Sequence, residues 1–172
     1  MTEAAGVEAW KEQTTAFDRI QSVATAVSQP QSASHIAGEA HVAENTARDH
    51  LKRLVELNVL LEREQDGTTL YGPDPLHTRV QMIRELLHQH DRDSLIELKQ
   101  SLQSQIEDWQ SQYAVESPTE LRDRAAETDT AAQTRDIRQT ASDWELISYR
   151  LSIVEDAIEN YNTYSEDAPV SA

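Results

Sequence analysis

The chain has 172 residues, with 31 acidic and 15 basic side chains, a net charge of −16 and no cysteine. The lack of cysteine excludes disulfides, thiolate metal sites and cysteine nucleophiles. The first ten residues have no basic and apolar leader pattern, and the longest apolar run, Val59–Leu61, is far too short to cross a bilayer. We therefore expect a soluble, cytoplasmic protein that does not bind membranes.

The acidity of the chain bears on the partners that it can have. Only Lys11, Lys52 and Lys99 are lysines, and aromatic residues make up 5% of the chain. This composition is typical of proteins from halophiles, whose cytoplasm holds molar salt. At such ionic strength the Debye length falls to about 3 Å, so long-range repulsion from nucleic acid largely disappears. The net charge therefore does not exclude a DNA partner.

The first elements in the chain are a polar extension, residues 1–13, and then a helix. Val7 and Trp10 are the residues of the extension that can dock onto a core. Thr15 and Asp18 stand at the spacing of a capping box, which predicts a helix start. An apolar stripe follows, and Pro30 ends the helix. The stripe consists of Phe17, Ile20, Val23, Ala24 and Val27.

Residues 32–72 predict two helices joined by a turn and followed by a β-hairpin. Ser32 or Ser34 caps a short helix that runs to Ala40, and a turn at His41 and Val42 leads to a helix at about 44–57. Its inward residues, at helical spacing, are Ala47, Leu51, Leu54 and Val55. Strands at about 60–64 and 68–71 then flank Asp66-Gly67, a strong hairpin signal. This order predicts a winged helix-turn-helix domain at 14–73, with a wing at 61–71, that binds double-stranded DNA.

The exposed face of the second helix carries the candidate DNA contacts. Asparagine and arginine pair with adenine and guanine edges, and threonine meets a thymine methyl or a phosphate. Basic residues further along the helix suit phosphates, and those at the wing tip suit a minor groove. Ala43 stands where a side-chain oxygen normally caps this helix. The predicted contacts are Ser34, Asn45, Thr46, Arg48, Asp49, Lys52, Arg53, Arg63, Gln65 and Thr68.

Residues 74–164 are predicted to form long amphipathic helices, and residues 165–172 a flexible tail. Apolar stripes run from Leu76 to Leu87, from Leu95 to Tyr113, and from Ile137 to Tyr161. Asp93 or Ser94 caps the second of these helices. The stripes either fold back within the chain or pair with those of a second subunit. We expect a homodimer in which the contacts come from Leu95, Leu98, Leu102, Ile106, Trp109, Trp144, Ile147, Leu151, Val154 and Ile158.

No pattern in the sequence predicts a metal, a cofactor or a catalytic group. His77, His88 and His90 lie near acidic residues, but positions 88 and 90 point about 200° apart on a helix and do not converge on one ion. No serine-histidine-acid spacing, glycine-rich phosphate loop or organised carboxylate pair is present. We expect a protein that is not an enzyme.

Three segments within residues 8–90 resemble a haloarchaeal winged-helix regulator family related to the ArsR and MarR transcription factors. They are residues 10–17, residues 32–37, and residues 42–51 with the sequence Val-Ala-Glu-Asn-Thr-Ala-Arg-Asp-His-Leu. The resemblance implies promoter binding through the second helix of the motif, and a homodimer. Family members commonly have serine where this chain has Ala43. Metal sensing of the ArsR type is not implied, because the cysteine ligands are absent.

The fold class that follows is mainly α with a small β-hairpin: a winged helix-turn-helix domain with long C-terminal helices in a hairpin or coiled-coil-like dimerisation region. The function that follows is that of a sequence-specific transcription regulator of a halophilic archaeon. The alternative is a winged-helix adaptor that docks partner proteins on its C-terminal helices.

Overall fold

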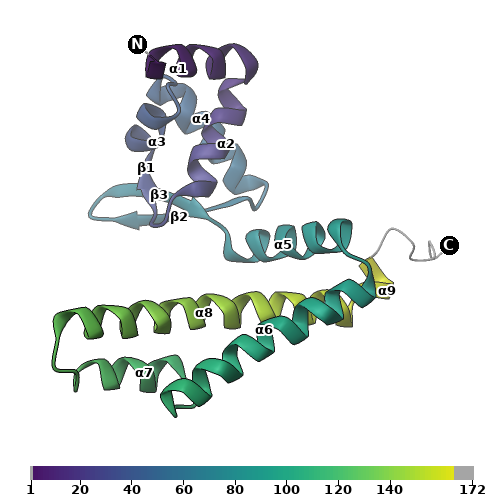
Figure 1. Ribbon diagram of the computed structural model, residues 1–172. Coiled ribbons are helices and arrows are strands. Elements are labelled where there is room, and N and C mark those ends of the chain that lie inside the picture. The colour runs from purple at the N-terminus through teal and green to yellow at the C-terminus, as the bar shows by residue number, and fades with distance from the viewer. Residues whose placement is uncertain (1, 165–172) are drawn as a thin grey trace. The chain divides into compact units, whose positions relative to one another are not determined.

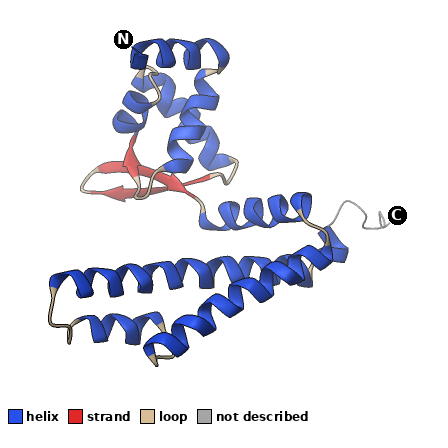
Figure 2. Ribbon diagram, in the orientation of Figure 1, coloured by secondary structure: helices blue, strands red, loops and turns tan. Residues whose placement is uncertain are grey.

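The computed structural model describes residues 2–164, except for the side chains of residues 2–5. The chain is mainly helical and contains a small antiparallel sheet of three strands (Figures 1 and 2). It divides into two compact units between Val80 and Gln81, a point that lies inside one helix. We describe each unit by itself.

The N-terminal unit consists of four helices, a three-stranded sheet and the first residues of a fifth helix. α4 packs against α2 and α3, and its C-terminal end leads directly into the sheet. The fully buried core includes Ile20, Ile36, Leu51, Leu54 and Leu60. The elements are α1 (Thr2–Gln13), α2 (Ala16–Ala26), β1 (Gln31–Ser32), α3 (Ala33–Glu39), α4 (Glu44–Glu56), β2 (Leu60–Gln65), β3 (Thr68–Pro73) and α5 (Pro75–Gln89).

Local sequence signals account for the ends of these elements. Thr15 and Asp18 form the predicted capping box, and the hydrogen bond that the Thr15 hydroxyl donates to the Asp18 carboxylate lowers the pKa of Asp18. Ser32, rather than Ser34, caps α3 by accepting the backbone N–H of His35 at 3.2 Å. His41 adopts a φ of 52° in the turn before α4, a region in which histidine is enriched among non-glycine residues.

The predicted hairpin forms around Asp66 and Gly67, which both have positive φ angles, of 51° and 77°. This is the backbone of a type I′ turn, in which glycine carries no steric penalty. β2 and β3 pair from Leu60 opposite Pro73 to Gln65 opposite Thr68. β1 adds a third strand on the other side of β3, giving the order β1-β3-β2. β1 has only two residues, which is too short for the alternation of apolar and polar residues that predicts a strand.

The N-terminal extension forms the helix α1, which is held to the rest of the unit by Arg19. The Arg19 guanidinium donates to the backbone oxygens of Thr14 at 2.8 Å and of Ala40 at 3.0 Å. It also lies 5.9 Å from the centre of the Trp10 ring, which meets His41 edge-on at 6.4 Å. As predicted, Trp10 docks, and it does so on the turn between α3 and α4.

The C-terminal unit is built on a long helix, α8, against which α6 and α7 pack. Trp109 and Trp144 lie 6.0 Å apart between ring centroids, in a cluster with the buried side chains of Val115 and Leu121. Arg122 forms an ion pair with Glu145, which joins α7 to α8. Besides the end of α5, the elements are α6 (Arg92–Tyr113), α7 (Pro118–Ala125), α8 (Ala131–Glu159) and α9 (Tyr161–Tyr164).

Two expectations about these helices need correction. The cap of α6 is Asp91, which accepts the backbone N–H of Ser94 at 2.8 Å, and not Asp93 or Ser94. The apolar stripes of α6 and α8 also pack against each other within the chain. Four residues expected at a dimer contact are consequently buried inside one subunit, namely Leu95, Leu102, Trp144 and Val154, and cannot meet a partner in this conformation.

The other six expected dimer residues are only partly buried. They are Leu98, Ile106, Trp109, Ile147, Leu151 and Ile158. The predicted tail, residues 165–172, lies outside the described residues. Among residues 2–164, no helix combines the length and the apolar content needed to cross a membrane.

Candidate functional site

The site is built on α4, because this helix is buried on one side and polar on the other. Ala47, Leu51 and Leu54 are fully buried and anchor it to the core of the N-terminal unit. The side chains at intervening positions must therefore face away from the core. Six predicted DNA contacts lie on this exposed face: Asn45, Thr46, Arg48, Asp49, Lys52 and Arg53.

The first turn of α4 lacks a side-chain cap. Ala43 occupies the N-cap position and accepts no hydrogen bond through its side chain, as expected from its type. The first N–H groups of a helix have no partner within the helix, and they carry the positive end of its dipole. Glu44, the first helical residue, places a carboxylate at this end. The terminus therefore has an acidic side chain nearby but no capping hydrogen bond from Ala43.

Arg48 is held by Glu44 across one turn of the exposed face. Its Nε and Nη2 atoms donate to the same Glu44 carboxylate oxygen, at 3.2 and 2.5 Å. This hydrogen bonding raises the pKa of Arg48. The two side chains are 57% and 44% exposed, so another acceptor can reach the guanidinium. The pair orients Arg48 along the helix.

The β2–β3 hairpin adds three exposed predicted contacts, Arg63, Gln65 and Thr68, beside the Asp66-Gly67 turn. The hairpin carries its own acidic side chains, and Glu64 accepts a hydrogen bond from Thr69 on the opposite strand at 3.0 Å. Arg63 is therefore the cation of a mixed-charge tip, not part of a basic patch.

Tyr71 connects the hairpin to α4 electrostatically. Its side chain is buried, and this burial raises the pKa of Tyr71. Glu62 adds to the rise, whereas the positive charge of Arg48 opposes it. Arg48 is thus close enough to act on a residue of β3.

The structure leaves all ten predicted contacts exposed, including Ser34 at the start of α3. Arg53 lies 5.8 Å from the centre of the Phe17 ring, so its guanidinium is positioned by α2. The sequence analysis assigned no role to Glu44, which pairs with Arg48 in the structure. The spacing of four residues between this glutamate and the arginine favours an ion pair on a helix and could have indicated the contact.

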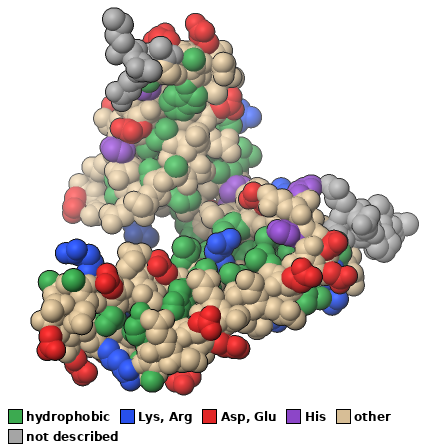
Figure 3. Space-filling view, viewed as in Figure 1, with side chains coloured by type: hydrophobic (Ala, Val, Ile, Leu, Met, Phe, Trp, Pro, Cys, Tyr) green, Lys and Arg blue, Asp and Glu red, His purple; other side chains and the backbone are tan. Residues whose placement is uncertain are grey.

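Charge is distributed unevenly along the chain. Residues 1–80 hold twelve acidic and seven basic side chains, a net charge of −5, whereas residues 81–172 hold nineteen and eight, a net charge of −11. The segment from Glu44 to Gln65 has five acidic and four basic residues and is nearly neutral. Acidic side chains are scattered over the visible face of α6, α7 and α8 (Figure 3). The candidate site is thus among the less acidic parts of the protein.

Within the described part of the chain, no group of three or more histidine, aspartate or glutamate side chains is arranged to hold a metal ion. The strongly oriented charged side chains of the site, Arg48 and Glu44, are paired with each other. The arrangement is suited to recognising a polar surface.

Comparison with known proteins places the chain in a family. No curated protein and no solved structure matches it. One family model, described as a family of unknown function (DUF7342), matches residues 14–163, which span both units. The chain belongs to the DUF7342 family.

Proposed function

We propose that this protein is a winged helix-turn-helix transcription regulator of a halophilic archaeon. In this proposal α3 and α4 form the helix-turn-helix and the β2–β3 hairpin forms the wing. The observation that carries the proposal is the two-sided character of α4. One side anchors the helix in the core, and the other exposes Asn45, Thr46 and Arg48 to solvent.

The proposed binding mode places the N-terminal turns of α4 in the major groove of duplex DNA. Asn45 and Arg48 have the side chains that pair with adenine and guanine edges. Lys52 and Arg53, further along the helix, contact phosphates, which position the protein without specifying sequence. Arg63 at the tip of the hairpin enters the neighbouring minor groove.

DNA binding requires the pair between Arg48 and Glu44 to open or to rotate. The pair is exposed, and exposed ion pairs contribute little to stability and are screened by salt. A guanine edge offers two acceptors to the same guanidinium. The exchange of one acceptor for another therefore has a low cost, and the high salt of a halophile lowers it further.

The proposed DNA-binding form is a homodimer, because two recognition helices one DNA turn apart match a pseudo-palindromic site. The buried parts of the α6 and α8 stripes do not contribute to such a dimer. Apolar side chains that remain exposed for it are Leu146 and Tyr149 of α8, 57% and 41% exposed, and Leu76 and Val80 of α5, 69% and 44% exposed.

The test is binding to promoter fragments, identified by genome-wide crosslinking and measured by fluorescence anisotropy in molar KCl. Arg48→Ala is expected to weaken specific binding by about tenfold or more, the discrimination of one bidentate base contact. Arg92→Ala removes the same charge from the exposed start of α6 and should leave binding unchanged. Unchanged binding by Arg48→Ala, with folding retained, would show that α4 is not the recognition helix.

A second candidate is a winged-helix adaptor that binds other proteins through its C-terminal helices. The exposed Leu146 and Tyr149 lie one turn apart on α8 and favour this alternative. The crosslinking experiment separates the two candidates. Discrete promoter peaks support the regulator, whereas a stable protein partner without such peaks supports the adaptor.

A further inference from the structure

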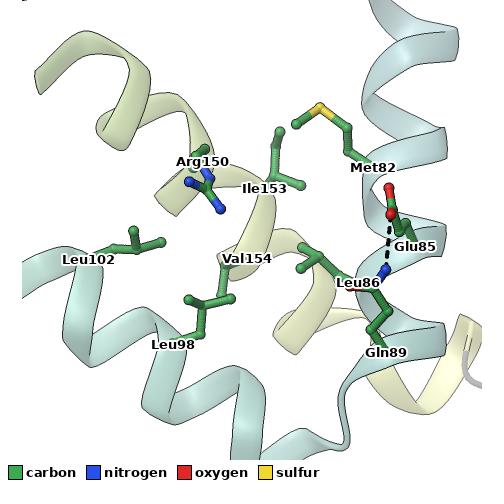
Figure 4. Close-up of a pocket in the computed structure, with 9 residues that line it drawn as sticks. All are labelled: Met82, Glu85, Leu86, Gln89, Leu98, Leu102, Arg150, Ile153 and Val154. Atoms are coloured by element: carbon green, nitrogen blue, oxygen red, sulfur yellow. Dashed lines mark hydrogen bonds between the residues drawn. The ribbon is translucent and has the colours of Figure 1, made fainter. Parts of the chain in front are cut away.

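A cavity of about 210 Å³ lies inside the C-terminal unit. It is formed by the last part of α5, the first half of α6 and the last part of α8, whose side chains converge on the same space (Figure 4). An apolar cavity of about 150 Å³ is large enough for benzene, whereas sites for drug-sized ligands begin at about 300 Å³. The cavity thus has the volume for a small organic molecule.

The walls of the cavity are mainly apolar. Leucine side chains come from α5 and α6, and β-branched side chains come from α8. Methionine, which adapts its shape to irregular ligands, completes the α5 wall. The apolar lining consists of Met82, Leu86, Leu98, Leu102, Ile153 and Val154. A ligand that fills this space must present an apolar body.

Among the residues that the structure describes, Arg150 is the only cationic one in the lining. In the described part of the chain, no side chain or backbone group forms a hydrogen bond or ion pair with its guanidinium. By contrast, Arg122 and Arg124 of the same unit are bound to a carboxylate and to backbone oxygens. Arg150 therefore offers a complete set of donors at the edge of an apolar space.

We propose that this cavity binds a small apolar monocarboxylate, with the carboxylate on Arg150 and the hydrocarbon body among the apolar side chains. An arginine fork matches a carboxylate with two parallel hydrogen bonds. The volume suits a body of about eight to ten heavy atoms, between benzene and a drug-sized ligand. This proposal does not depend on DNA binding.

Glu85 limits the charge of the ligand. It belongs to the α5 wall of the same cavity, where one of its oxygens accepts a hydrogen bond from Gln89 at 2.9 Å. A second anionic group on the ligand would meet this carboxylate without a cation to balance it. Dicarboxylates and phosphate esters are therefore disfavoured relative to monocarboxylates.

The experiment measures octanoate binding to the full-length protein by calorimetry and by ligand-observed NMR, at moderate and at molar KCl. Saturable binding that weakens in high salt is expected, because the Arg150 contact is partly screened. Octanamide has the same shape but no charge. It should bind about tenfold more weakly, because it cannot form the charge-assisted hydrogen bond with Arg150. Equal affinities for octanoate and octanamide would overturn the proposal.

Variants complete the test. Arg150→Gln should reduce octanoate affinity to that of octanamide, and Leu98→Phe, which fills the cavity, should abolish binding of both. Arg138→Gln is the matched control, because Arg138 is exposed on the same helix, about 18 Å from Arg150 along its axis. Absence of saturable octanoate binding to the wild-type protein, or an unchanged affinity in Arg150→Gln, would contradict the assignment.

Discussion

The two units of this protein differ in how they use their exposed polar residues. In the N-terminal unit, short helices and a sheet surround one core, and the exposed face of α4 carries Arg48, which is paired with Glu44 of the same helix. In the C-terminal unit, Arg122 ties α7 to α8 and Arg124 holds the end of α6, so polar side chains fasten helices together. An exposed charged side chain that is paired only within its own helix is a better candidate for recognition than one that joins two helices.

The units also differ in their charge. The N-terminal unit is only moderately acidic and nearly neutral around α4, whereas the C-terminal helices carry most of the negative charge. This distribution is compatible with a polyanionic partner at α4 and with a strongly hydrated surface on the long helices. We expect a substitution in the core of one unit to leave the stability of the other unit unchanged.

The largest expected effect is the loss of the tryptophan pair in the C-terminal unit. Trp144 is 2% exposed and packs on Trp109, so Trp144→Ala should lower the free energy of unfolding of this unit by about 3–5 kcal/mol. Hydrogen exchange should show faster exchange in α7 and α8, with protection in α2 and α4 retained. Loss of protection in both units together would mean that they fold as one.

The reciprocal change is Leu54→Ala in the N-terminal unit. Leu54 is completely buried, so the substitution should destabilise this unit by about 2–5 kcal/mol in urea titrations followed by circular dichroism. Leu57→Ala is the control, because Leu57 is 56% exposed at the end of the same helix. Similar effects of the two substitutions would contradict the placement of α4.

A smaller, opposite effect is expected from completing the cap of α4. Ala43→Ser supplies the missing side-chain acceptor and should stabilise the N-terminal unit by about 0.5–2 kcal/mol. Thermal unfolding of the variant and the wild type measures this gain. If Ala43→Ser is neutral, the first turn of α4 is already satisfied by another group.

The ion pair on α4 predicts a modest gain of function. Glu44→Gln frees Arg48 and removes a negative charge near the proposed phosphates, so DNA affinity should rise by up to about fivefold, the range of an exposed pair. Anisotropy titrations measure this change. Glu56→Gln removes the same charge at the other end of α4 and should have less effect. A loss of affinity in Glu44→Gln would instead assign Glu44 to orienting Arg48.

The smallest expected effect concerns pH and the C-terminal unit. The hydrogen bond from Arg122 lowers the pKa of Glu145, and Glu145 in turn raises the pKa of Arg122. The stabilisation is therefore present above the ordinary pKa of a glutamate and is lost as the pH falls through the lowered value. Glu145→Gln should lower the melting temperature slightly at neutral pH, and this difference should vanish in acid.

Signals between near neighbours in the chain predicted much of this fold. The capping box of Thr15 and Asp18, the turn at His41 and the hairpin at Asp66-Gly67 all form as expected. Each depends on contacts within a few residues, where side-chain type and backbone geometry are directly linked. The exposure of the six candidate contact residues on α4 follows in the same way from the periodicity of its buried positions.

Other features depend on partners far away in the chain. β1 exists because Gln31 and Ser32 meet Leu70 and Tyr71, and two residues have no periodicity of their own. The first helix is attached through Arg19, whose acceptors are backbone oxygens that no side-chain pattern can reveal. α6 is capped by Asp91, although Asp93 and Ser94 have side chains that cap helices equally well.

The long apolar stripes of the C-terminal helices can be read from the amino-acid order alone, because helical spacing shows which residues share a face. That α6 and α8 cover each other's stripes within the chain becomes known only once the helices are placed in space. An apolar stripe gains similar free energy from any apolar partner, since the hydrophobic effect is not directional. The same reason explains why the cavity beside Arg150 could not be foreseen: its walls come from three helices that meet only in the folded chain.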